Sequence, residues 1–370
     1  MSAESGVIPS LNGVRAIAVG LVIVSHAGLG HYVPGGFGVT VFFVLSGFLI
    51  TTLLIGEYRK RGTISLGRFY ARRALRLMPA LYVVTALATL AALVGWTRGG
   101  TDPLALASLL LYFANYFQLF FGSDGIPAGM AVVWSLAVEE HFYLFWPPVL
   151  LWLLHRRLDR ARIGAVLLAT CVAALIWRLL LSLYLDAPPG YNEWATDARI
   201  DSLLVGCWLA VARNPWLEPT LAPNRRVDAL LLAGGIGLIL VSLAVRDELF
   251  RATLRYTLQN IGIVGLLWLA VARADTWPFR ILGHPVADYI GRVSYSLYLS
   301  HLVLMEAMAH QMPDAPIWSR SVAAVILALL FAEAMRRLVE DPIATLRARL
   351  HASGGTAPPV NRSAGSATPS

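Results

Sequence analysis

The chain has 370 residues, of which 57% are hydrophobic and 14% are charged, and its formal net charge is +8. Soluble globular proteins carry about 25% charged residues, so this composition excludes an ordinary soluble domain and indicates a membrane protein with many spans. The positive charge lies largely in short segments between apolar runs, as is typical of cytoplasmic loops, and it does not require a nucleic-acid partner.

Apolar runs follow one another along almost the whole chain. A helix needs about 20 residues to cross a bilayer, and runs of comparable length lie near 12–30, 36–56, 77–97, 103–121, 134–154, 163–185, 199–213, 227–245, 253–272, 293–311 and 318–338. We therefore expect an all-α polytopic transmembrane helical bundle in residues 1–350. The remainder, 351–370, is rich in Ser, Gly, Ala and Pro and is expected to be a disordered tail. Cys171 and Cys207 lie in apolar runs, so we expect neither a disulfide framework nor a metal site.

Basic loops predict the orientation of the bundle. The segments 57–76 and 155–162 are both strongly basic, which places both in the cytoplasm. Three apolar runs separate them, yet two loops on the same side require an even number of crossings. The run 103–121 begins at a proline, Pro103, and contains the polar Asn115, so we expect it to be re-entrant or interfacial. About ten spans then remain, with both termini in the cytoplasm.

The first run contains two ionisable residues, Arg15 and His26. Such side chains cost about 2.5–3.5 kcal/mol in a membrane span and are usually functional. Eleven positions make about three helical turns, so both should share one helix face about 16 Å apart. Imidazole titrates near physiological pH, so His26 suits a general base or a nucleophile that briefly carries a transferred group. The alternative is a histidine whose hydrogen bonds are satisfied by a neighbouring carbonyl.

A cluster of arginines lies at the cytoplasmic start of the third run. Arg72, Arg73 and Arg76 provide planar guanidinium groups that suit the phosphate groups of a cofactor, and Arg73 and Arg76 are one turn apart. Arg15 is expected near the same membrane surface and joins them as a candidate for cofactor binding. Ordinary topology also explains part of this positive charge.

Glu139 is a carboxylate inside the run 134–154, where it is costly unless it is paired. Tyr143 follows at i+4 on the same helix face. Glu139 is a catalytic candidate because it would orient His26 and stabilise its protonated form. The alternative is a structural ion pair with a cation such as Arg199.

Two later segments carry further candidates. Arg199 and Asp201 begin the seventh span, where they line an entrance for a substrate or form a structural salt bridge. The segment SYSLYLSH places Ser294, Tyr298 and His301 on one helix face, and these residues together with Tyr295 border a substrate or pack helices together.

Several segments in this order resemble acyltransferase family 3, the integral membrane O-acyltransferases. The segment LNGVRAIAVGLVIVSHA has the family's Arg and His separated by ten residues, and RFYARRALRLMPALY has its Arg-x-x-Arg pair. WSLAVEEHFYLFWP resembles the family pattern through Trp134, Ser135, Leu136, Glu139 and Tyr143, and GGFGVTVFFVLSGFLIT, RIDSLLVGCWLA, SYSLYLSH and LVEDP resemble further family segments. Asn12 stands where many members have Asp, a mild departure that leaves the fold unaffected.

The resemblance implies an acyltransferase for groups other than amino-acyl groups, in a bacterial cytoplasmic membrane. Acyl-CoA, by default acetyl-CoA, would be the donor, and the acceptor would be a hydroxyl of a carbohydrate or glycosylated molecule. Trp134 and Tyr143 would then lie beside the substrate. The alternative function is a proton-coupled transporter that uses Arg15, His26 and Glu139 as a relay. Against it, the sequence has no visible inverted repeat and no pair of broken helices.

Overall fold

The computed structural model describes residues 9–218 and 224–345, and the predicted tail at 351–370 lies outside the described residues. Every regular element in the described ranges is a helix, which confirms the all-α prediction. The long helices are α1 (Pro9–Val24), α2 (Gly35–Arg61), α3 (Leu66–Leu93), α6 (Trp134–His155), α7 (Arg160–Leu183), α9 (Thr196–Ala212), α10 (Arg225–Ala244), α12 (Leu254–Ala272), α13 (Pro285–Gln311) and α14 (Ile317–Met335). The shorter elements are η1 (Ser25–Leu29), α4 (Pro103–Leu110), α5 (Ala114–Phe121), η2 (Met130–Val133), α8 (Tyr191–Trp194), α11 (Glu248–Ala252), η3 (Phe279–Gly283) and η4 (Arg336–Glu340).

Six helices in the described residues are long and apolar enough to cross a membrane. They are the helix Ser10–Leu29 that combines α1 with η1, followed by α2, α3, α7, α10 and α12. The count of about ten spans stays a prediction. The run 103–121 forms the two helices α4 and α5 of 8 residues each. Each is about 12 Å long, too short to cross a bilayer, in agreement with the prediction that this run does not span.

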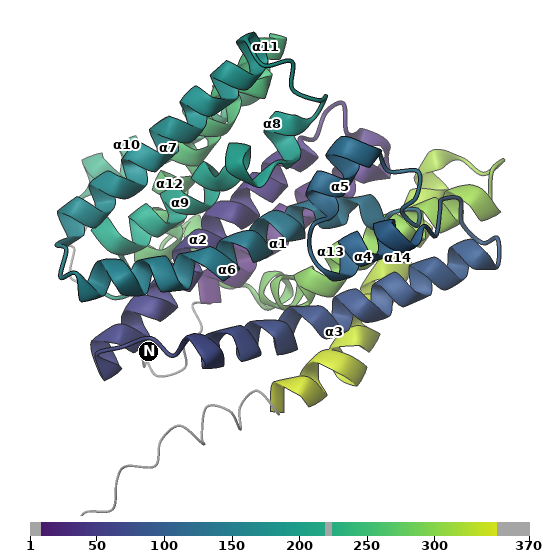
Figure 1. Cartoon of the computed structure of the whole chain (residues 1–370), viewed down its shortest axis with the longest axis horizontal. Coiled ribbons are helices and arrows are strands. Elements are labelled where there is room, and N and C mark those ends of the chain that lie inside the picture. Colours follow the sequence, from purple (N-terminus) through teal and green to yellow (C-terminus); the bar gives the residue numbers. More distant parts are fainter. Residues whose placement is uncertain (1–8, 219–223, 346–370) are drawn as a thin grey trace, which may run out of the picture.

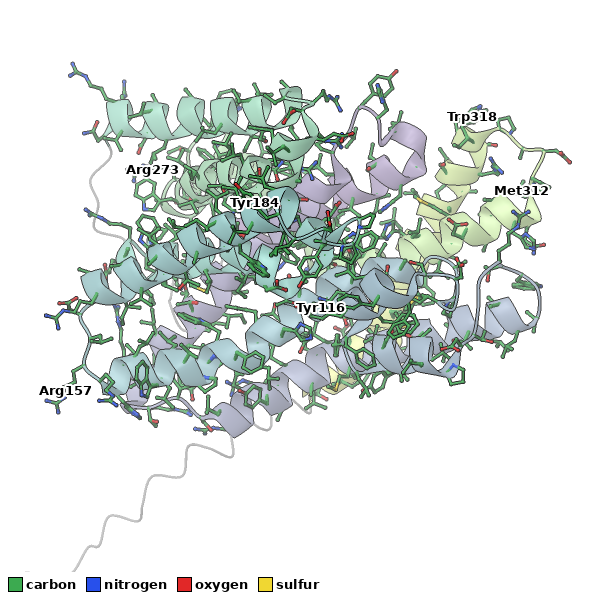
Figure 2. All side chains as sticks on the ribbon, turned by 45° about the horizontal axis from the view of Figure 1, so that its top comes forward. Tyr116, Arg157, Tyr184, Arg273, Met312 and Trp318 are labelled. Carbon is green, nitrogen blue, oxygen red and sulfur yellow. The ribbon has the colours of Figure 1, made fainter. Side chains whose placement is uncertain are left out.

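Successive long helices reverse direction, so their ends fall at two ends of the bundle (Figure 1). We call one the basic end and the other the far end. Arg157 and Arg273 lie at the basic end in Figure 2, and Met312 and Trp318 lie at the far end. The basic end holds the junctions 62–65, 156–159 and 273–284, and the far end holds 30–34, 94–133, 184–195, 245–253 and 312–316.

Helices α2 and α9 pack with their backbones in direct contact, because glycines face the partner helix. A Cβ atom on Gly47 would lie 1.9 Å from the carbonyl oxygen of Leu203, and one on Gly206 would lie 2.1 Å from that of Val44. Small residues allow this close approach between helices in membranes. The contact fixes α2 against α9, the helix that carries Arg199 and Asp201 near its start.

Candidate active site

A cavity of about 80 Å³ lies in the interior between five helices, and we call it the central cavity. Its size allows several water molecules. Its wall brings together three guanidinium groups, one carboxylate and a set of hydroxyl groups that are far apart in the sequence. The polar lining comes from Arg15 on α1, Ser46 on α2, Arg73 and Arg76 on α3, Ser135, Glu139 and Tyr143 on α6, and Ser294, Tyr295 and Tyr298 on α13.

Glu139 is held in the wall of this cavity by two hydroxyl groups. Ser46 Oγ donates a hydrogen bond to Glu139 Oε1 at 2.9 Å, and the hydroxyl of Tyr143 donates to Oε2 at 3.2 Å. The guanidinium of Arg73 stacks over the Tyr143 ring, 4.8 Å from its centroid. Tyr143 therefore shares a face with Glu139 as predicted, and it links the carboxylate to one of the cavity's cations.

The three arginines that were predicted together are divided in the structure. Arg73 and Arg76 line the central cavity, whereas Arg72 does not. Arg72 instead lies 3.6 Å from Glu57, which also attracts Arg68 at 3.9 Å. Because successive helix positions point about 100° apart, only part of the cluster can face the interior. Arg72 thus belongs to an ion-pair group at the basic end.

His26 lies at the far end, in η1, where its side chain is exposed and paired with a second histidine. His26 Nδ1 lies 3.1 Å from Nε2 of the buried His301, and His301 Nδ1 lies 2.6 Å from the carbonyl oxygen of Tyr298. A carbonyl oxygen only accepts, so His301 Nδ1 carries a hydrogen and the neutral ring accepts at Nε2. His26 therefore donates from Nδ1, which leaves the lone pair of the neutral ring on Nε2.

The prediction that Glu139 orients His26 stays a prediction, because the described residues show no hydrogen bond between the two side chains. The hydrogen bonds described for Glu139 come from Ser46 and Tyr143, and the ring in contact with His26 is that of His301. Tyr298 connects the cavity that holds Glu139 with the pair of His26 and His301, since it lines the central cavity and its carbonyl oxygen contacts His301. The sequence had placed His301 on the same helix face as Tyr298, and that spacing was the only indication that His301 could belong to the site.

Two further candidates, Tyr295 and Trp134, differ in their position relative to the central cavity. The hydroxyl of Tyr295 donates to the carbonyl oxygen of Leu77 at 2.8 Å, and its ring lines the central cavity. Trp134 begins α6 and packs edge-on against Phe43, with ring centroids 6.3 Å apart. Trp134 does not line the central cavity, whereas Tyr295 does.

Arg199 and Asp201 are both buried, and each has a different partner. Asp201 accepts from Arg178 Nη2 at 2.8 Å, and both side chains of this ion pair are almost fully enclosed. Arg199 donates to Thr40 Oγ1 at 2.9 Å, and its guanidinium lies 3.9 Å from the centroid of the Tyr256 ring. The salt-bridge interpretation therefore holds for Asp201, with Arg178 as the cation. Arg178 is the single arginine in the apolar run 163–185, and a charged residue in such a run indicates a buried ion pair.

Comparison with known proteins adds independent evidence. A family model described as an acyltransferase domain matches residues 8–335. The peptidoglycan O-acetyltransferase OatA of Listeria monocytogenes is 30% identical over 91% of this chain and 56% of its own length. A candidate O-acetyltransferase of Staphylococcus aureus (strain COL) is 33% identical over 90% of this chain and 57% of its own length. A candidate peptidoglycan O-acetyltransferase of Bacillus subtilis is 31% identical over 91% and 55%.

These relatives are longer proteins, and the chain spans about half the length of each, between 55% and 57%. No solved structure is significantly similar to the chain. The match of the family model covers all the helices that line the central cavity.

Proposed function

The chain belongs to the acyltransferase family, and from that premise we propose that it is an enzyme that transfers an acetyl group from acetyl-CoA to a hydroxyl of a surface carbohydrate. The observation that carries the proposal is the central cavity, in which Arg15, Arg73 and Arg76 meet Glu139. Three cations around an interior space suit an anionic donor, and the names of the relatives supply the acetyl group and the class of acceptor.

The donor would be held by the arginines of the central cavity. Guanidinium groups bind phosphates through two parallel hydrogen bonds, and Arg73 and Arg76 are one helical turn apart on α3. The stack of Arg73 on the Tyr143 ring restricts its side chain before a ligand arrives. Glu139 balances part of the positive charge and is itself fixed by Ser46 and Tyr143.

The transfer step would use the lone pair on Nε2 of His26. As the acceptor hydroxyl attacks the thioester carbonyl carbon, His26 Nε2 takes the hydroxyl proton. The carbon–sulfur bond breaks, the sulfur leaves as a thiolate, and the imidazolium returns the proton to it. His301 stabilises the imidazolium by accepting from His26 Nδ1. Attack by Nε2 itself, with an acyl-imidazole intermediate, uses the same geometry.

The proposed setting is a bacterial cytoplasmic membrane with several spans and both termini in the cytoplasm. Donor cations then lie toward the compartment that holds coenzyme A, because the basic end is cytoplasmic under the positive-inside rule. His26 is exposed at the opposite, far end. The acceptor hydroxyl would therefore reach His26 from outside, as acetylation of a cell-surface glycan requires.

Kinetics with labelled acetyl-CoA test the proposal on protein reconstituted in nanodiscs. Arg73→Ala removes a charge-assisted bond of about 1.5–3 kcal/mol, so the KM for acetyl-CoA should rise about 10- to 150-fold. Arg72→Ala is the matched control, since it lies outside the central cavity, and its KM should stay within about twofold. Equal effects of both variants would refute the donor site. Vesicles that move a solute without consuming acetyl-CoA would instead favour a transporter.

A further inference from the structure

A second and larger cavity, about 330 Å³ in volume, opens at the far end of the bundle, and we call it the far-end cavity. It lies between the end of α7, the short helices α8 and α11, and the start of α12 (Figure 1). Its volume falls at the lower end of the range for small-molecule sites. Neither the arginines of the central cavity nor Glu139 contribute to its wall.

The lining of the far-end cavity is polar and its charges balance. Two carboxylates, Glu193 and Glu248, face two guanidinium groups, Arg251 and Arg255. A pocket for a phosphate or carboxylate would carry excess positive charge, whereas equal numbers of acids and bases suit an uncharged ligand with many hydroxyl and amide groups. Carboxylates accept from hydroxyls, and guanidinium groups donate to carbonyl and ring oxygens.

The wall also contains aromatic rings and unused hydrogen-bonding atoms. Tyr191 is partly exposed on the rim, and the buried Tyr256 contributes to the wall. Asn192 Oδ1 and Arg255 Nε are buried atoms that have no hydrogen-bond partner among the described residues. One accepts and the other donates, and buried polar groups normally find partners. A bound molecule with both donors and acceptors would satisfy them, and tyrosine rings suit the apolar faces of such a molecule.

Contacts through two glycines connect the far-end cavity with the segment that carries His26. A Cβ atom on Gly36 would lie 3.4 Å from Glu193 Oε1, so the carboxylate of the cavity rim lies against the start of α2. A Cβ atom on the neighbouring Gly35 would lie 2.8 Å from the side chain of Ser25. Ser25 directly precedes His26 in η1. The cavity rim therefore adjoins the exposed imidazole at the same end of the bundle.

We propose that the far-end cavity is the acceptor subsite and binds one uncharged N-acetylated hexosamine unit of a glycan chain. This inference rests on the proposed function. The sugar packs on the ring of Tyr191, its hydroxyls donate to Glu193 and Glu248, and its amide and ring oxygens accept from Arg251 and Arg255. The adjoining sugar unit of the chain then lies over the rim at Gly36, where its hydroxyl reaches His26.

Binding of a β-1,4-linked tetrasaccharide of N-acetylglucosamine to the full chain in nanodiscs, measured by calorimetry without acetyl-CoA, tests the inference. We expect Tyr191→Ala and Glu193→Gln each to raise the Kd at least about tenfold. Tyr191→Phe keeps the ring and should bind more tightly than Tyr191→Ala, which separates stacking from folding. Arg246→Ala is the matched control for charge at the far end, because Arg246 is exposed and does not line the cavity.

The inference fails if the wild-type protein does not bind the tetrasaccharide, or if the cavity variants bind it as well as the control does. Competition by glycerol phosphate would also overturn it, since that result identifies an anion or lipid-headgroup site. Failure of the proposed function has a different signature: saccharide binding persists with the expected pattern of variants, but acetyl-CoA is not consumed.

Discussion

His301 is predicted to act as the positioning residue for His26, and His301→Ala tests this. The substitution removes the acceptor 3.1 Å from His26 Nδ1, so the ring is free to change its rotamer and tautomer. A hydrogen bond to a group that becomes charged contributes about 1.5–3 kcal/mol. At 1.36 kcal/mol per factor of ten in rate, kcat should fall about 10- to 150-fold. The KM for acetyl-CoA should stay unchanged, because His301 does not line the central cavity.

The assay is release of coenzyme A and transfer of labelled acetyl to the saccharide, with a double-mutant cycle on His26 and His301. If His301 acts only through His26, the double alanine variant should be no slower than His26→Ala alone. His301→Gln is the conservative control. Its amide can donate to the Tyr298 carbonyl oxygen and accept from His26, so it should recover part of kcat.

Two results would refute this reasoning. The first is a kcat for His301→Ala within about twofold of the wild type, less than any lost hydrogen bond of this kind predicts. The second is full additivity of the two substitutions, because it would show that His301 contributes to transfer or to folding independently of His26. A general loss of packing would also raise the KM for acetyl-CoA, so an unchanged KM separates positioning from instability.

The remaining predictions concern stability, measured as the free energy of unfolding by titration with SDS in mixed micelles. Gly47→Ala should destabilise the protein by about 1–3 kcal/mol, because the added Cβ would collide with the backbone of α9. Gly56→Ala is the control, because a Cβ at Gly56 would meet open space and should have no such cost. Equal effects of the two substitutions would contradict the packing argument. Arg178→Ala should cost about 3–5 kcal/mol because it leaves the buried Asp201 unpaired, and a loss below about 1 kcal/mol would show that the pair is not needed for stability.

The fold class was predictable from the sequence because bilayer-length apolar runs have few alternatives to helices. The prediction that 103–121 does not cross came from counting basic loops, and the two short helices agree with it. The number of spans is harder, since helices that line a polar cavity carry polar residues themselves. Helix α6 illustrates this, because it carries Glu139 and Glu140 and is not among the six apolar candidates.

Contacts in the candidate site were predictable where both residues lie on the same helix. Glu139 and Tyr143 share a face because they are i and i+4 on α6. The pairing of His26 with His301 depends instead on how α1 packs against α13. That packing includes a contact in which a Cβ on Gly291 would lie 2.0 Å from the carbonyl oxygen of Asn12. Periodicity within one helix does not encode the register between two helices, so the sequence did not indicate that His26 contacts His301.

The separation of cations from imidazole along α1 has a mechanistic consequence. Arg15 lines the central cavity, and His26 lies eleven positions further on, about 16 Å away at 1.5 Å per residue. Under the proposed function, a donor held by its phosphates at these arginines would extend its acyl arm along the bundle to reach His26. Tyr298 stands on that route, with its hydroxyl 2.7 Å from Ser135 Oγ and its carbonyl oxygen on His301. A change at Tyr298 would affect both the wall of the central cavity and the hydrogen bond of His301. Under the proposed function, entry of the acyl group and orientation of His26 are therefore expected to be coupled.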